Sequence, residues 1–99
     1  MASLWITEFR AMPMDVNGRT VEAAALPAIT TQKITISGTS AQSAALNADT
    51  KFVRVHTDAI CHILAGDNPT ATTSNMRMPA DETEYFGVIA GQKIAAITG

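Results

Sequence analysis

The chain's clearest pattern is an alternation of apolar and polar side chains with a period of two residues. Residues 31–38 place Ile34 and Ile36 on one side and Lys, Thr and Ser on the other, as expected of a β-strand with one buried face. Residues 51–57 repeat the pattern, with two valines on one side and Arg and His on the other. Two half-buried strands are therefore predicted here.

The second half of the chain continues as short strands separated by turn residues. Residues 59–65 are apolar on both faces apart from His62, so this segment is predicted to be a central strand covered on both sides. The Gly-Asp-Asn-Pro sequence at 66–69 has the composition of a turn. Three more short strands are predicted, at 76–78, 83–88 and 92–98.

The N-terminal third gives weaker signals. Residues 4–10 are rich in β-forming side chains and are predicted to form the first strand or an extended arm. An Asn-Gly pair within residues 12–19 predicts a hairpin that leads into residues 20–26. Good helix formers make helix a competitor in residues 40–48. That segment is short and lies between strands, which favours a strand or a single turn.

These elements predict an all-β fold with about seven to eight short strands and no long helix. We expect a small β-sandwich or jelly-roll-like domain with an extended N-terminal strand or arm. No linker divides the chain, so residues 1–99 are taken as one β domain. Within it, residues 1–30 would form the N-terminal arm and hairpin, and residues 31–99 the main sandwich.

Composition and charge narrow the classes of partner. Hydrophobic residues make up 46% of the chain and aromatic residues only 5%, so the core must consist mainly of Val, Ile, Leu and Ala. Seven Lys and Arg against nine Asp and Glu give a net charge of -2. Because no basic stripe is available to bind phosphates, nucleic acid is not expected as a partner.

The sequence also bears on location. The most apolar long window, residues 21–29, contains Glu22 and Pro27 and is shorter than the roughly 20 residues that span a membrane. No membrane role is expected. The first residues lack the basic and apolar regions of a secretory signal, so we expect synthesis and retention in the cytoplasm. One cysteine cannot form a disulfide framework.

No pattern in the chain predicts catalysis, a cofactor or a metal. Cys61 and His62 would face opposite sides of a strand, too far from His56 for a shared metal ion. The carboxylates at 81–82 are interpreted as a solvated turn, since no nucleophile motif or phosphate loop accompanies them. The oxygens at 67–68 could bind calcium, but turn chemistry explains them equally well.

The N-terminal aromatic residues allow two interpretations. Trp5 and Phe9 lie on one face of the predicted strand, and Leu4 and Ile6 lie on the other. The segment can be a core strand of this domain. Alternatively, it can be an apolar arm that another protein chain completes, which would make these four residues a partner-binding site. Tyr85-Phe86 places one ring on each face of its strand.

Several segments of the C-terminal half form a recognisable series. They are Phe52-Val53-Arg54-Val55-His56-Thr57-Asp58, Gly66-Asp67-Asn68-Pro69-Thr70-Ala71-Thr72, Met76-Arg77-Met78-Pro79-Ala80, Glu84-Tyr85-Phe86-Gly87-Val88 and Gly91-Gln92-Lys93-Ile94-Ala95. With these segments, about the C-terminal half of the chain resembles a group of small proteins encoded in the structural gene modules of tailed bacteriophages. A weaker similarity extends to residues 34–46 and to the opening Trp-Ile-Thr-Glu.

The resemblance implies a structural virion protein, foremost a capsid decoration or cement protein that binds the assembled head and bridges major capsid subunits. Such proteins are often small β-sandwiches or jelly rolls. The implied partners are the major capsid protein and further copies of this chain, and the implied location is the capsid surface after synthesis in the host cytoplasm. The group has no catalytic residues to carry over.

Two other functions remain in view. The protein could be a tail- or head-fibre-associated β-sandwich that recognises a host surface ligand, and copy number in virions would separate this role from decoration. A small hydrolase or metal enzyme would require a bound metal ion.

Overall fold

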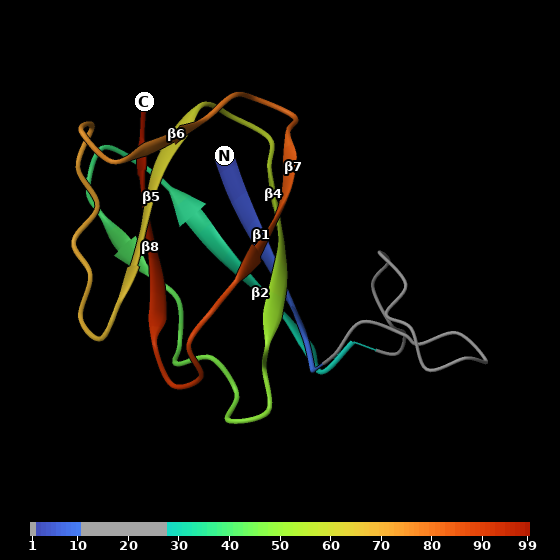
Figure 1. Ribbon diagram of the computed structural model, residues 1–99. Coiled ribbons are helices and arrows are strands. Elements are labelled where there is room, and N and C mark those ends of the chain that lie inside the picture. The colour runs from blue at the N-terminus through green and yellow to red at the C-terminus, as the bar shows by residue number, and fades with distance from the viewer. Residues whose placement is uncertain (1, 11–27) are drawn as a thin grey trace.

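The structure is a computed structural model that describes residues 2–10 and 28–99. Eight strands form two antiparallel four-stranded sheets, with no helix in the described ranges (Figure 1). The first sheet has the order β2-β1-β4-β7, built from Thr30–Ile36, Ala2–Phe9, Phe52–Thr57 and Thr83–Gly87. The second has the order β3-β8-β5-β6, built from Ala41–Gln42, Lys93–Thr98, Cys61–Gly66 and Met76–Met78. The predicted all-β sandwich of short strands is confirmed.

Most connections cross from one sheet to the other, as in a jelly-roll-like fold. Only β1–β2 and β5–β6 are sequence neighbours that also pair within one sheet. As a result, strands that are distant in the sequence lie side by side. β1 pairs with β2 and also with β4, although β4 begins more than forty residues later.

The segment predicted as a first strand or arm is an internal strand of the first sheet. Its residues pair along nearly their whole length with both neighbours, and Leu4 and Ile6 are fully buried. Residues 2–9 are thus part of the same sandwich as the strands of residues 31–99. The hairpin predicted within residues 12–26 lies outside the described residues.

The core lies between the two sheets and follows the predicted alternation. Ile34 and Ile36 of β2 face inward, as do Val53 and Val55 of β4. The second sheet and the loop after β3 contribute the remaining members of this cluster, Leu46, Cys61, Ile63, Met78, Ile94 and Ala96. Each fully buried Val, Leu, Ile or Met contributes about 1.5–3 kcal/mol relative to exposure, so aliphatic burial is the main stabilising term.

Strand β5 differs from the sequence prediction in its second half. Cys61, His62 and Ile63 are buried, but Leu64 on the outer face is 37% exposed. The expectation of a strand covered on both sides was therefore wrong beyond Ile63. The His62 side chain also points to the outer face but is covered from solvent, and its Nδ1 donates a hydrogen bond to the Asn75 carbonyl oxygen at 3.1 Å.

Residues 40–48 form a two-residue strand, Ala41–Gln42, followed by an extended loop and a turn. The preference for strand or turn over helix is confirmed. In residues 2–10 and 28–99 no helix is long and apolar enough to cross a membrane.

Candidate functional site

The outer face of the first sheet carries most of the aromatic side chains of the protein. The chain has three Phe, one Trp and one Tyr. On β1 and β4 the residues that alternate with the core side chains face outward. Tyr85 of β7 pairs with the outward Arg54 and so lies on the same side. Four outward side chains are aromatic, and we call them the outer aromatic face: Trp5, Phe9, Phe52 and Tyr85. In a chain so poor in aromatics, this placement gives the most distinctive surface of the described residues.

One end of this face is a cluster of three rings. Phe9 and Phe52 are paired across β1 and β4 and are stacked with centroids 5.0 Å apart. Tyr85 tilts against Phe52 at 6.4 Å. Phe9 and Phe52 are buried, whereas Tyr85 is 53% exposed. Phe86 packs against the core instead, so the prediction of one ring on each face of this strand is confirmed.

The other end of the face is centred on Trp5. The register places Lys33 of β2, Trp5 of β1 and His56 of β4 in one row across the sheet. The His56 ring lies 5.8 Å from the indole, and Lys33 Nζ lies 5.5 Å from its centroid. His56 Nδ1 is also 2.8 Å from the Thr83 hydroxyl, which fixes the imidazole beside the indole.

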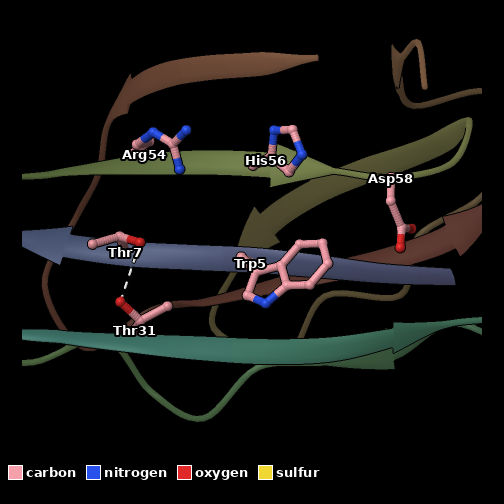
Figure 2. A pocket seen from close by; sticks show the side chains of 6 residues that line it. All are labelled: Trp5, Thr7, Thr31, Arg54, His56 and Asp58. Carbon is pink, nitrogen blue, oxygen red and sulfur yellow. Dashed lines mark hydrogen bonds between the residues drawn. The ribbon is translucent and has the colours of Figure 1, made fainter. Parts of the chain in front are cut away.

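A shallow depression of about 400 Å³ surrounds Trp5, lined by Trp5, Thr7, Thr31, Arg54, His56 and Asp58. Figure 2 shows the indole spread over β1, with Arg54 toward one end of the depression and Asp58 toward the other. The Thr31 hydroxyl donates a 3.2 Å hydrogen bond to the Thr7 hydroxyl. Asp58 Oδ1 accepts a bond from the Ser3 amide at 2.7 Å. An aromatic ring, a guanidinium, a carboxylate and hydroxyls thus meet on one open surface.

A second surface feature is an apolar opening between the sheets, on the side where β5 and β6 face β7. It encloses about 240 Å³ and is lined by Ile63, Leu64, Ala65, Asn75, Met76, Phe86, Gly87, Val88 and Ile94. Met76 and Met78 share a face, as predicted, but Met78 is buried while Met76 is 55% exposed. We call this feature the apolar opening.

The four residues predicted to bind a partner divide between core and surface. Leu4 and Ile6 are fully buried between the sheets, and Phe9 is 3% exposed under its stacked neighbour. Trp5 is half-buried and reaches the depression. The interpretation of residues 4–10 as a core strand agrees with this placement, and partner binding through the segment stays a prediction that falls on Trp5.

Sequence reasoning did not assign the other side chains of the depression to a site. Arg54 and His56 were predicted only to face outward from their strand. The alternation of apolar and polar residues indicates that Arg54 and His56 share a face. Their position beside Trp5 depends on the register between β1 and β4.

Glu8 is another residue that the sequence did not single out. It is 1% exposed and points inward from β1. Its carboxylate accepts hydrogen bonds from the Thr50 hydroxyl at 2.8 Å, the Asn47 amide at 2.7 Å and the Gln32 side-chain amide at 2.9 Å. These bonds fasten the loop between β3 and β4 to the first sheet, so Glu8 has a structural role.

The residues considered for metal binding are dispersed. Cys61 lies in the core, His62 on the outer face of the second sheet and His56 on the first sheet. Within the described ranges no group of three or more His, Cys, Asp or Glu side chains could hold a metal ion. Asn68 Oδ1 accepts a 2.9 Å bond from the Gln42 side chain, and residues 67–68 form a bend directly after β5.

The turn at residues 81–82 is exposed. Asp81 has a φ of 60°, a left-handed conformation that Asp adopts more readily than most residues. This geometry agrees with a solvated turn between β6 and β7.

The buried thiol of Cys61 gives a test of the core. Burial raises the pKa of this thiol above its ordinary value of 9.0, and the hydrogen bond to Thr57 lowers it by a smaller amount. Because the pKa of the thiol is higher in the folded protein than in the unfolded chain, its ionisation does not affect the free energy of unfolding below pH 9.0. As the pH rises from 9.0 through the folded-state pKa, this free energy falls. We expect a disulfide reagent at pH 8 to modify Cys61 only at the rate of unfolding. Modification of the native protein as fast as the denatured protein would contradict this burial.

Comparisons of the chain with protein-family models, with curated proteins and with solved structures find no match. The function must therefore be inferred from the sequence, the fold and the two surface features.

Proposed function

We propose that this protein is a structural virion protein of a tailed bacteriophage. In this proposal it is a capsid decoration or cement protein, which binds the assembled head, bridges neighbouring major capsid subunits and associates with further copies of itself there. The observation that carries the proposal is the apolar opening, where Met76 remains exposed although it shares a face with the buried Met78, and where Leu64 of the adjoining outer face is exposed at the rim. The β-sandwich fold and the sequence resemblance support the same class.

Exposed apolar side chains at an opening into the core are typical of surfaces that a protein partner covers. Met76 is 55% exposed and Leu64 37% exposed, and the partly buried Phe86 and Val88 also line the opening. A capsid subunit that inserts an apolar side chain here and covers the rim would bury Met76 and Leu64. Because a shell presents many equivalent sites, and neighbouring copies support one another, a modest affinity at each site suffices for full coverage.

A second candidate function is that of a tail- or head-fibre-associated module that recognises a host surface ligand. The observation that favours it is the depression around Trp5, which combines an aromatic ring with charged and polar groups. The two functions predict different copy numbers in virions. A decoration protein would accompany the capsid subunits over the whole head, whereas a fibre-associated protein would be confined to a few positions.

A double variant of the apolar opening tests the proposal. We expect Leu64→Gln with Met76→Gln to weaken binding to phage heads assembled without this protein by about tenfold or more, since burial of one such side chain contributes about 1.5–3 kcal/mol. Co-sedimentation of purified protein with these heads measures the effect. Ile60→Gln is the matched control, because Ile60 is 40% exposed but does not line the opening. Unchanged binding of the double variant would contradict the proposed contact.

A further inference from the structure

The depression around Trp5 is centred on the internal strands β1 and β4 of the first sheet and reaches the edge strand β2 through Thr31. A flat ring meets several polar groups there. Trp5 stands on β1, and Arg54 and His56 stand on the adjacent β4. Figure 2 shows the indole with its broad face turned toward the viewer, while the polar side chains lie around its margin. A flat aromatic face of this kind can stack against the C–H face of a sugar ring.

Charge at this surface is divided between the two ends of the depression. Arg54 lies at one end, and the single carboxylate among the lining residues, Asp58, lies at the other, with His56 and Trp5 between them. Four residues of extended chain separate Arg54 from Asp58, which corresponds to about 13 Å. Lys33 adds a second cation beside the indole. The Arg54 end therefore suits a negatively charged group, since a guanidinium binds a carboxylate with two parallel hydrogen bonds.

The remaining groups suit hydroxyls. Asp58 uses Oδ1 to accept a bond from the Ser3 amide, and its carboxylate carries a second oxygen that can accept bonds from ligand hydroxyls. Thr7 and Thr31 offer hydroxyls beside the ring. Lys33 is exposed and has a flexible stem, so its ammonium can leave the ring and join the ligand's acid group.

We propose that this depression binds an acidic carbohydrate, a sugar chain that carries carboxylates. Trp5 stacks against a sugar ring, Arg54 and Lys33 bind a carboxylate, and Asp58 with the threonine hydroxyls binds sugar hydroxyls. The site goes beyond the proposed function, because it does not depend on whether the protein coats the head or belongs to a fibre.

The position of the site favours a sugar over an acidic peptide. β1 and β4, which carry Trp5, Arg54 and His56, are paired on both sides, so a peptide cannot add to them as a further strand. The free edge of this sheet is on β2, one strand away from the indole. The depression is open and shallow, so it offers no enclosed pocket for an apolar side chain of a peptide. Ring stacking and hydroxyl bonding need neither of these features.

The only tryptophan of the protein lies at the site, so its fluorescence reports binding directly. We expect trigalacturonate or trisialic acid to change Trp5 emission in a saturable manner, and added salt to weaken this binding. The neutral galactotriose should bind with an affinity at least about tenfold lower, since it lacks the carboxylates. If neither acidic sugar changes the emission, or if hexaglutamate binds as tightly as they do, the proposal is wrong.

Two arginine variants, one at the depression and one on the other sheet, complete the test. Arg54→Gln should lower affinity for the acidic sugar that binds by about tenfold while leaving affinity for galactotriose nearly unchanged. Arg77→Gln is the control, because Arg77 is exposed on β6 of the other sheet, and it should bind like the parent protein. Equal affinity of the Arg54 and Arg77 variants for the acidic sugar would overturn the assignment. The Leu64 and Met76 variant tests shell binding at the apolar opening, and its outcome does not affect sugar binding at the depression. Either proposal can therefore be wrong without the other.

Discussion

Removal of residues 1–10 should abolish folding of the domain. β1 is bonded on one side to β2 and on the other to β4, and it supplies Leu4 and Ile6 to the centre of the core. Without it the first sheet loses its internal strand, and β2 and β4 no longer share a partner. We expect the truncated chain to show no cooperative unfolding transition by circular dichroism, because the lost burial exceeds the margin of stability of a small domain.

A substitution on the same strand serves as the control for this truncation. Thr7→Val changes an outward side chain of β1, and the variant should unfold cooperatively with a midpoint close to that of the parent chain. If the truncated chain kept a cooperative transition like the parent's, β1 would be a dispensable arm. That result would favour the alternative interpretation of residues 4–10.

Replacement of Glu8 by alanine should cost about 2–4 kcal/mol of unfolding free energy. The change removes the acceptor for Thr50, Asn47 and Gln32. The buried Thr50 hydroxyl is left without this partner, which costs about 1–3 kcal/mol, and the loss of the two part-buried bonds adds to that cost. In a domain of this size each kcal/mol corresponds to about 4–8 °C in the unfolding midpoint, so thermal denaturation resolves the effect. Glu8→Gln should lose less, since its amide oxygen can still accept a bond.

Glu84→Ala is the matched control for the Glu8 variants. Glu84 lies on the edge strand β7 and is exposed, so its replacement should change stability by no more than about 0.5 kcal/mol. Equal effects of the two alanine variants would show that the hydrogen bonds of Glu8 do not hold the β3–β4 loop against the first sheet.

The strands were predictable from the sequence because their signal is local. The alternation around Ile34, Ile36, Val53 and Val55 specifies both a strand and its inward face, and these side chains form the core. The exposed second half of β5 was missed because Leu64 is as apolar as a core residue. Its exposure depends on whether a further layer covers the outer face of the second sheet, which the local pattern does not specify.

The candidate site was only partly predictable. Alternation placed Trp5 opposite Leu4 and Ile6, and separately placed Arg54 and His56 on an outer face. Their meeting depends on pairing between strands that are far apart in the sequence, and no local pattern records that register. Glu8 shows the same limit, since its position on the apolar side of β1 was visible but its hydrogen-bonding partners lie 24, 39 and 42 residues away.

The copy number of the protein in purified virions tests the central proposal most directly. Quantitative mass spectrometry against the major capsid protein gives this number, and cross-linking through a cysteine introduced at Met76 identifies the neighbour of the apolar opening. The proposal predicts a fixed ratio of the same order as the capsid subunits and cross-links to the major capsid protein. Absence from virions, or a few copies confined to the tail or a fibre, would contradict it.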